Sequence, residues 1–366
     1  MSKSFKDVYK SKKVLITGNT GFKGSWLTVW LKMLGADVYG ISDRIHTKPS
    51  NYEVLNLEDQ IKNHFVDIND FESLYNTISE INPDFVFHLA AQAIVKDSYS
   101  DPINTFKTNV IGTLNLLEVL KKLNKECIAV IITSDKCYDN VEWLWGYKET
   151  DHLGGKDPYS ASKACAELVF RTFFESYFST TTSKVKIASA RAGNVIGGGD
   201  WANHRIIPDA VKSWSNKEVL QIRSPNSTRP WQHVLEPLSG YLLLGQKLFE
   251  NNSLSGESFN FGPKPETNFS VESLLLKMSE FWPDVKWQVV KSDKSIKEAG
   301  LLKLNCDKAL SMLGWTPNLN FDSTIEFVAN WYKEFYSNNS DMLSLTKLQI
   351  EEYIETAKNQ SLIWTR

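Results

Sequence analysis

The stretch Thr17-Gly18-Asn19-Thr20-Gly21-Phe22-Lys23-Gly24 decides the fold of this 366-residue chain. It follows a short apolar run, Val14-Leu15-Ile16, which predicts a strand. After it comes a helical pattern that ends at Gly35, a residue type common just beyond helix C-termini. The helical pattern places five apolar side chains on one face: Trp26, Leu27, Trp30, Leu31 and Leu34. Strand, glycine turn and helix in this order are the opening of a dinucleotide-binding βαβ unit.

The glycine turn has a physical reason to bind a dinucleotide. Glycines let the backbone approach a pyrophosphate closely, and the helix N-terminus presents free N–H groups and a partial positive charge. The spacing is G-x-x-G-x-x-G, not the commoner G-x-G-x-x-G, and an ordinary tight turn is the alternative. The flanking strand and helix favour the binding turn. Its cofactor-binding candidates are Gly18, Asn19, Gly21, Phe22, Lys23 and Gly24.

The second predicted strand, Asp37-Val38-Tyr39-Gly40-Ile41, bears on the choice of cofactor. In NAD-binding folds an acidic residue at the end of this strand binds the adenosine ribose hydroxyls. Asp43 lies within about a residue of that place, while Ser42 occupies the usual position itself. Arg44 follows, and an arginine there favours a 2′-phosphate. The sequence therefore favours NAD over NADP through Asp43.

The overall composition is that of a globular protein. Hydrophobic residues make up 42% and charged residues 23%, and the formal net charge is −2. This balance gives no basic field for nucleic acid or an anionic membrane. No apolar run reaches the length of a membrane span, and the N-terminus lacks the apolar core of a signal peptide. The four cysteines have neither C-x-x-C nor metal-site spacing, so we expect free thiols, no metal and a cytoplasmic protein.

The order of the predicted elements indicates the fold class. Strands and helices alternate through residues 1–194, which predicts an α/β, Rossmann-like, doubly wound parallel sheet that binds NAD. Residues 45–62 are polar and are expected to form a loop. Residues 195–366 are expected to form mainly a smaller mixed α/β substrate-binding domain and a C-terminal helix. A segment of roughly 232–255 is expected to return to the first domain.

Two later residues have the spacing of a catalytic pair. Tyr159 and Lys163 lie four apart on a predicted helix, which places their Cβ atoms about 6 Å apart on one face. A nearby ammonium favours the phenolate, so we expect the pKa of Tyr159 to be lowered toward neutrality. A tyrosinate can then take a proton from a substrate hydroxyl, which Ser134 at the end of a neighbouring strand would also bind. A surface Tyr/Lys pair is the alternative for Y-x-x-x-K alone.

With these motifs in place, the chain resembles the extended short-chain dehydrogenase/reductase family along nearly all its length. The resemblance rests on Gly18, Gly21 and Gly24, Asp67-Ile68, Leu89-Ala90-Ala91, Ser134, Tyr159 and Lys163, and Leu313-Gly314-Trp315-Thr316-Pro317. It implies NAD as cofactor and a nucleotide sugar as substrate. It also adds cofactor-binding candidates to those of the glycine turn: Asp67, Ile68, Leu89, Ala90, Ala91, Tyr159 and Lys163. For the two alanines, tight helix packing is an equal alternative.

The residues after a further predicted strand, the apolar run Cys127-Ile128-Ala129-Val130-Ile131-Ile132, favour one reaction within that family. Sugar-nucleotide 4,6-dehydratases place an acid directly after the Ser or Thr of the strand end, and here the residues are Asp135-Lys136. The run SDKCYDN over 134–140, together with GNTGFKGSW, RAGNVIGGGDW and RPWQHVLEP, resembles CDP-glucose 4,6-dehydratases. The resemblance implies Asp135 as the acid that protonates the departing 6-hydroxyl. It implies for Lys136 either the base at C5 or a charge that stabilises the enolate.

The substrate end has a second set of candidates. A diphosphate is bound well by guanidinium groups, so Arg205, Arg223 and Arg229 are candidates together with Asn194 and Ser134. Arg229, beside Pro230-Trp231, resembles the family's diphosphate-binding arginine. For Arg205 and Arg223 a solvated surface charge is an equal alternative.

The expected activity is thus the conversion of CDP-glucose to CDP-4-keto-6-deoxyglucose and water, for deoxysugars of surface polysaccharides such as a lipopolysaccharide O-antigen. Another nucleotide-sugar 4,6-dehydratase or a 4-epimerase is an alternative, and a non-catalytic NAD-binding regulator is one of a different class. The family resemblance also implies a homodimer or homotetramer built on the helices around 104–123 and 159–178. No nucleic acid or membrane partner is expected.

Overall fold

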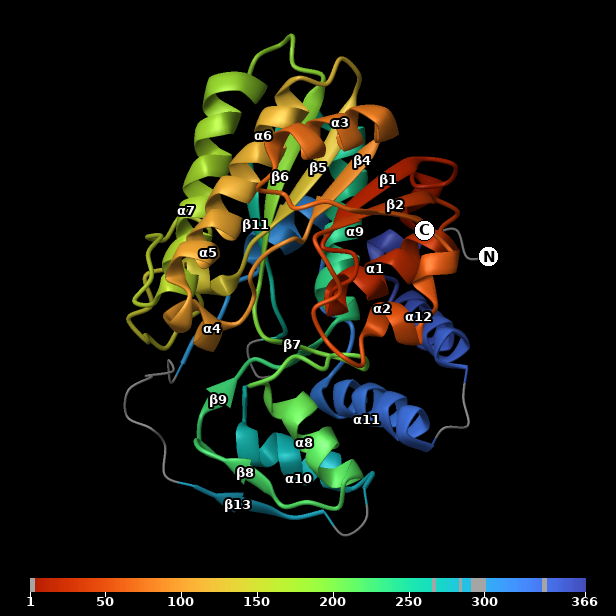
Figure 1. The fold of residues 1–366 in the computed structure, drawn as a ribbon, viewed down its shortest axis with the longest axis vertical. Coiled ribbons are helices and arrows are strands. Elements are labelled where there is room, and N and C mark those ends of the chain that lie inside the picture. Colours follow the sequence, from red (N-terminus) through yellow and green to blue (C-terminus); the bar gives the residue numbers. More distant parts are fainter. Residues whose placement is uncertain (1–3, 265–267, 283–284, 291–300, 338–340) are drawn as a thin grey trace.

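The computed structural model describes residues 4–264, 268–282, 285–290, 301–337 and 341–366. Within them, seven parallel strands form a central sheet in the order β3-β2-β1-β4-β5-β6-β11 (Figure 1). The strands are β1 (Lys13–Thr17), β2 (Asp37–Ser42), β3 (Lys62–Phe65), β4 (Phe85–His88), β5 (Cys127–Ile132), β6 (Val185–Ala192) and β11 (Ser258–Phe261). The strand order reverses between β1 and β4, where α/β sheets bind ligands. The predicted Rossmann-like fold is confirmed.

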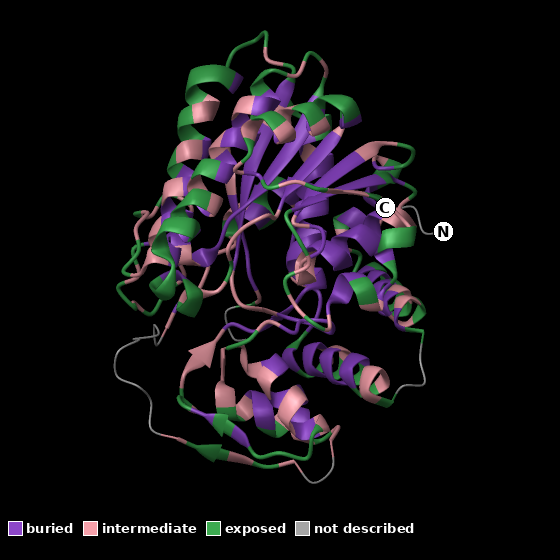
Figure 2. Cartoon of the chain, in the orientation of Figure 1, coloured by how far each residue is buried: buried purple, intermediate pink, exposed green. Residues whose placement is uncertain are grey.

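Helices cover both faces of this sheet because its strands are apolar on both sides. Val14 and Ile16 lie in one core and Leu15, between them, lies in the other. The first core is covered by α1 (Phe22–Met33), α9 (Leu235–Glu250) and α12 (Met342–Asn359). The second is covered by α3 (Phe71–Ile81), α6 (Gly112–Lys121) and α7 (Pro158–Phe173). Figure 2 shows the strands buried between these layers.

The helix expected around 104–123 is continuous but not uniform. It consists of α5 (Pro102–Phe106), the π-helical turn η3 (Lys107–Ile111) and α6. The loop expected over 45–62 is wrong in part, because it contains α2 (Asn51–Val54) and η2 (Leu57–Asp59) and ends in β3. The Ser50 side chain caps α2 by accepting a hydrogen bond from the Glu53 N–H. Tyr52, Leu55 and Leu57 are buried beneath the polar residues, and that burial is what folds the segment.

Smaller elements gather beyond the carboxyl edge of the sheet (Figure 1). Three short strand pairs lie there: β7 (Val195–Ile196) with β10 (Gln232–His233), β9 (Thr228–Arg229) with β12 (Phe269–Ser270), and β8 (Leu220–Ile222) with β13 (Trp287–Val289). The helices of this region are α8 (Ile206–Ser215), α10 (Val271–Ser279) and α11 (Phe321–Ser337). The remaining elements are η1 (Phe5–Asp7), α4 (Val95–Ser100), η4 (Asp135–Cys137), η5 (Phe174–Phe178), η6 (Asn252–Leu254), η7 (Ala309–Leu313) and η8 (Ile363–Thr365).

The chain crosses between these two regions more than once. After β10 it runs back along the sheet as α9, and β11 then pairs with β6 just beyond the segment 232–255. The C-terminal α12 packs against α1 and α11 of its own chain. All four cysteines are free thiols. Among the described residues, no helix is both long and apolar enough to cross a bilayer.

Candidate active site

The candidate catalytic residues meet where β5 ends and α7 begins. Ser134 follows β5 directly and caps the short turn η4, since its Oγ accepts from the Lys136 N–H at 3.2 Å. The same hydroxyl donates to the Asp135 Oδ1 at 2.9 Å. Both side chains are buried at the strand end. The local cap therefore fixes the serine and the carboxyl as one unit.

Tyr159 and Lys163 lie on the first two turns of α7, which packs against η4. The Asp157 side chain caps this helix by accepting from the Ser160 N–H at 2.9 Å. The Tyr159 N–H, left over at the helix start, donates to the Ser98 Oγ at 3.2 Å. The two side chains are 8% and 5% exposed. Tyr159 and Lys163 are therefore buried on one helix face beside η4, as the i,i+4 spacing predicts.

The predicted lowering of the pKa of Tyr159 is wrong. Burial raises the pKa of Tyr159 to about 12, against the opposing effect of a hydrogen bond with Ser134. Burial also lowers the pKa of the Lys163 ammonium to about 8. The prediction counted the attraction between the two groups and left out the cost of burying each charge.

Asp135 has the ionisation behaviour of an acid. Burial raises its pKa, although Lys136, the Ser134 hydroxyl and Lys23 act in the opposite direction. A raised pKa keeps a carboxyl protonated to higher pH, which a proton donor needs. Its Oδ2 faces the end of β6, where a Cβ built on Gly193 would lie 3.1 Å away.

Two lysines stand near this carboxyl in different surroundings. The Lys136 side chain is half-buried, and its ammonium forms no hydrogen bond or ion pair with any described residue. Lys23, on the first turn of α1, lies with its Nζ 3.5 Å from the Tyr241 hydroxyl. Burial, followed by the charges of Arg205 and Lys163, lowers the pKa of Lys23 to about 7, and Asp135 acts in the opposite direction. The side chain of Lys23 thus faces the catalytic candidates.

The glycine turn passes a test of fit for a dinucleotide. Gly18 has φ +75°, and a Cβ there would lie 2.7 Å from the Ala90 N, so the turn requires glycine. A Cβ on Gly24 would overlap the Gly18 carbonyl oxygen. The N-cap of α1 is Gly21, which has no side chain to bind the first free N–H groups. Those donors are therefore available to a pyrophosphate.

The other candidate cofactor-binding residues around that turn differ in the contacts that their side chains make within the protein. The Asn19 side chain is used inside the fold, where it accepts from the Ser42 hydroxyl at 2.9 Å and donates to Asn63 at 2.8 Å. Asp43 binds the His46 Nε2 at 2.8 Å. The ring of Phe22 lies under Gly197, where an added Cβ would be 2.9 Å from its Cζ. The predicted contacts of the turn residues therefore depend on their backbone more than on their side chains.

The candidates at the ends of β3 and β4 are partly accessible. The exposed Asp67 accepts from the Asn69 N–H at 2.9 Å, and Ile68 beside it is buried. Three half-buried apolar residues follow β4: Leu89, Ala90 and Ala91. His88, at the end of that strand, has its pKa lowered to about 3 by burial and is therefore neutral. It hydrogen-bonds Thr17 and Thr113, as a packing residue does.

The fold brings only some of the candidate substrate-binding residues close to the catalytic candidates. The Arg205 guanidinium forms an ion pair with Asp200 at 2.7 Å, and its charge acts on Tyr159 and Lys23. Asn194 is half-buried beside Gly193, which faces Asp135. Arg223 is exposed at the end of β8. Arg229, on β9, donates to the Thr228 carbonyl at 2.8 Å. Asn194 and Arg205 thus lie at the catalytic candidates, and Arg223 is turned to solvent.

Three side chains at this site escaped the sequence analysis. Tyr241 comes from α9 and Asp200 from the loop after β7, and only the fold places them beside Lys23 and Arg205. Glu167 lies four residues beyond Lys163 on α7 and is buried behind the site. Its spacing, Y-x-x-x-K-x-x-x-E, is a signal that a helical pattern provides and that the sequence analysis left out.

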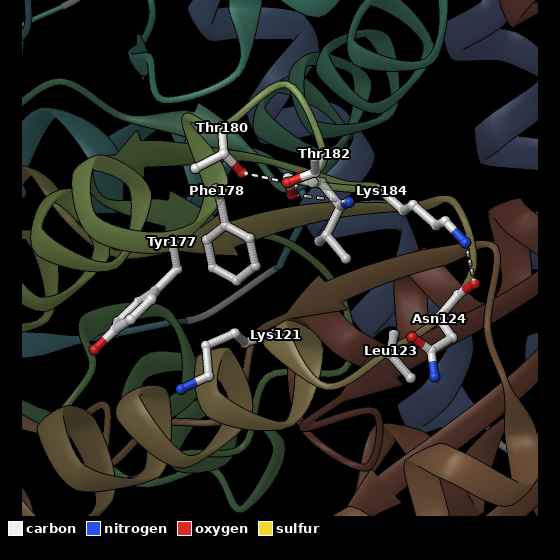
Figure 3. Close-up of a pocket in the computed structure, with 10 residues that line it drawn as sticks. Lys121, Leu123, Asn124, Tyr177, Phe178, Thr180, Thr182 and Lys184 are labelled. Carbon is white, nitrogen blue, oxygen red and sulfur yellow. Dashed lines mark hydrogen bonds between the residues drawn. The ribbon is translucent and has the colours of Figure 1, made fainter.

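Two surface cavities of about 240 Å³ lie apart from these residues. One borders Lys121, Asn124, Tyr177 and Lys184 near the start of β6, at the opposite edge of the sheet (Figure 3). There the Lys184 ammonium donates to the Asn124 carbonyl at 3.0 Å, and Lys121 is paired with Glu118. The other borders Trp145, Pro230 and Leu304. Neither is lined by Ser134, Asp135 or Tyr159.

Comparison with known proteins places this geometry in a family. The family model described as GDP-mannose 4,6 dehydratase matches residues 15–328. The chain is 46% identical to a CDP-glucose 4,6-dehydratase of Salmonella typhimurium, over 95% of this chain and 98% of that one. It is 26% identical to a UDP-glucose 4-epimerase of Mycoplasma pneumoniae, over 89% and 98%.

A solved structure supports the fold. A UDP-glucose 4-epimerase of Thermotoga maritima superposes with a TM-score of 0.75 at 24% identity, over 88% of this chain and 99% of that one. The resemblance predicted from the sequence motifs is confirmed by these matches. The chain belongs to the GDP-mannose 4,6 dehydratase family, one of the extended short-chain dehydrogenases/reductases.

Proposed function

We propose that this chain is an NAD-dependent CDP-glucose 4,6-dehydratase, which converts CDP-glucose to CDP-4-keto-6-deoxyglucose and water. The observation that carries the proposal is the 46% identity to a CDP-glucose 4,6-dehydratase over almost the full length of both chains. The site supports it, because a buried acid follows Ser134 directly. An epimerase has no hydroxyl to expel and needs no acid at this place.

NAD is the cofactor that the site fits. Its pyrophosphate would lie against the glycine turn and the free N–H groups of α1, with Asp43, Asp67 and Ile68 toward the adenosine end and Leu89, Ala90 and Ala91 beside the turn. When bound, NAD supplies the hydride acceptor for the C4 hydrogen and returns that hydride at C6. No external reductant is then consumed.

The protein side chains divide the proton transfers of this reaction. Tyr159 takes the proton of the 4-hydroxyl, with Ser134 hydrogen-bonded to the same oxygen and Lys163 beside it. The resulting 4-keto group acidifies the C5 proton. Asp135, protonated because burial raises its pKa, donates to the departing 6-hydroxyl. Water leaves, and the C5–C6 double bond is then reduced: the hydride adds at C6, and a proton adds at C5 from the group that removed it or from solvent.

Lys136 serves the C5 position in this proposal. In its neutral form it is the base that removes the C5 proton, and in its charged form it stabilises the enolate. Its ammonium has no hydrogen-bond or ion-pair partner among the described residues, and it lies half-exposed beside Asp135, which suits either role. The substrate diphosphate is assigned to guanidinium groups, with Arg205 and Arg229 as the principal candidates and Arg223 and Asn194 as further ones.

A product assay tests the proposed function. Purified protein is incubated with NAD and, separately, with CDP-, dTDP-, UDP- and GDP-glucose, and mass spectrometry follows the loss of one water. We expect the loss with CDP-glucose. Loss from another nucleotide sugar alone would move the substrate and keep the reaction. An isomer without water loss would indicate a 4-epimerase, and NAD binding without turnover would indicate a regulator.

We further propose a homodimer or homotetramer that works in the cytoplasm and serves deoxysugar synthesis for surface polysaccharides. Exposed apolar side chains on the helices expected to pair support the assembly: Ile103, Phe106, Ile111 and Leu168. Free cysteines suit a reducing compartment. Sedimentation equilibrium would measure the assembly, and a single species at the 41.7 kDa chain mass would contradict it.

A further inference from the structure

Behind the catalytic candidates lies an ion pair that the reaction scheme does not use. The Arg191 Nη2 on β6 forms an ion pair with the Glu167 Oε2 on α7 at 2.7 Å, and the two side chains are only 4% and 1% exposed. Glu167 also accepts hydrogen bonds from three hydroxyls: Ser189 at 2.9 Å, Ser258 at 3.3 Å and Thr133. A buried carboxylate with this many donors is held in one position.

The hydrogen bonds of this pair lead to the catalytic strand end. Thr133, which donates to Glu167, is the residue directly before Ser134. Arg191 donates to the Tyr138 hydroxyl at 2.8 Å, and Tyr138 follows η4 directly. Tyr138 in turn donates to Asn260 of β11 at 2.8 Å. The network therefore holds the segment that carries Ser134, Asp135 and Lys136 at both of its ends.

The negative charge of the same carboxylate acts on Lys163 and raises the pKa of its ammonium. Glu167 lies one helical turn beyond Lys163, on the same face of α7. The other charged or titratable groups that interact with Lys163 come from three further elements: Cys137 of η4, His88 of β4 and Lys23 of α1. Burial raises the pKa of the Cys137 thiol and lowers that of His88 to about 3, so both are uncharged near neutrality. Among the described residues, Glu167 is then the anion that acts on Lys163.

We propose that Glu167 is a positioning residue of the dehydration: with Arg191 it fixes α7 against the end of β5, and its carboxylate supplies the negative charge that faces Lys163. This inference rests on the proposed function of the site. Glu167 is buried behind the catalytic candidates, and it acts through Thr133 and Lys163.

The charge of Glu167 has a predictable effect on pH dependence. Burial by itself would raise the pKa of Glu167, but the Arg191 guanidinium and the hydroxyl donors hold it below its ordinary value. The residue therefore stays ionised. Burial lowers the pKa of Lys163 to about 8, and Glu167 opposes that change. Without the carboxylate, the ammonium would be lost at lower pH, and the positive charge one helical turn beyond Tyr159 would be lost with it.

The test is the pH profile of kcat for CDP-glucose in E167Q, which keeps the size and one acceptor oxygen but removes the charge. We expect the alkaline limb to move about one pH unit to lower pH, with KM changed by less than about twofold. S189A is the matched control, because it removes a hydrogen bond to the same carboxylate and keeps the charge; its limb should not move. E167D keeps the charge, so its limb should return to that of the wild type even if kcat falls.

A double variant distinguishes the loss of the Glu167 charge from misfolding. E167Q leaves an uncompensated buried guanidinium, so E167Q/R191M, which removes both charges, is measured in parallel. It should show the same shifted limb. An unmoved limb in E167Q or in the double variant, or an equal shift in S189A, would overturn the inference. If the wild type produces no dehydrated CDP-sugar, the proposed function fails instead, so the two failures are distinguishable.

Discussion

The buried charged residues on the two sides of the β5 strand end differ in whether they form ion pairs. On the side that faces the catalytic candidates, Asp135, Lys136 and Lys23 stand close together without forming an ion pair among the described contacts. On the side that faces the core, Glu167 and Arg191 form an ion pair, and both accept or donate further hydrogen bonds.

The difference has a physical consequence. Burial without an ion-pair partner raises the pKa of Asp135 and lowers that of Lys23, and such groups can exchange protons. Burial with a partner fixes the charge, as it does for Glu167. A reaction that moves three protons needs ionisable groups with shifted pKa values at the substrate. It also needs paired groups of fixed charge that hold those residues in place.

The largest effect is expected from Y159F, which removes the proton acceptor on the reactive side. We expect kcat to fall about 10⁴-fold, because no other group takes the 4-hydroxyl proton. The melting temperature should stay within a few degrees of the wild type, since phenylalanine keeps the buried ring and removes the hydroxyl that hydrogen-bonds Ser134. Product formation by mass spectrometry measures the loss. An active Y159F variant would remove Tyr159 from its role.

D135N should separate the two halves of the reaction. An amide of the same shape cannot donate the proton to the 6-hydroxyl, so we expect water loss to slow about 10³-fold. Oxidation at C4 does not need this acid and should continue. Bound NADH should therefore accumulate, which its absorbance at 340 nm would reveal. Parallel loss of oxidation and elimination would contradict the separate role of Asp135.

Glu236 offers a contrasting buried carboxyl on the core side, because it has no arginine partner. It accepts from the Asn318 and Leu319 N–H groups and from the Tyr353 hydroxyl. Burial raises its pKa to about 7, against these hydrogen bonds. The native state therefore binds this proton more tightly than the unfolded chain. Its contribution to stability is complete below the unfolded pKa and is lost as the pH rises through the folded pKa.

The free energy of unfolding should consequently fall by about 3 kcal/mol between pH 4.5 and pH 7 from this group alone. In E236Q that slope should be absent, and denaturant unfolding at several pH values would measure it. Equal slopes in the wild type and E236Q would show that Glu236 does not hold a proton in the native state.

The smallest effect is expected at Arg205, which lies at the edge of the reactive side. R205Q should raise KM for CDP-glucose about tenfold and change kcat less, because a guanidinium that binds the diphosphate contributes mainly to ground-state binding. R366Q, at the exposed chain end, is the matched loss of one positive charge and should leave KM unchanged. A KM for R205Q equal to that of R366Q would remove Arg205 from the substrate site.

The reactive side could be predicted from sequence to a large extent. Gly18 and the Tyr159/Lys163 pair belong to short motifs whose geometry is local, a left-handed turn and an i,i+4 helix face. A strand followed by Ser134-Asp135 places both side chains at the carboxyl edge of any parallel sheet. The central sheet followed from the alternation of apolar strands and amphipathic helices for the same reason.

The core side, and the contacts between distant segments on the catalytic side, could not be predicted in this way. Tyr241 and Lys23 are far apart in sequence, and Glu167 meets Arg191 only when β6 lies beside α7. The pKa of Tyr159 depends on burial, which a motif does not reveal. The helix α2 formed in a segment that local polarity favoured as loop, because Tyr52 and Leu55 find a core made by other elements.

An internal oxidation, elimination and reduction can be followed with CDP-[4-²H]glucose and NAD in unlabelled water. We expect the deuterium to leave C4 and to appear at C6 of the 4-keto-6-deoxy product, where NMR would locate it. Deuterium lost to solvent, or retained at C4 of an epimerised sugar, would show that the hydride is not transferred from C4 to C6.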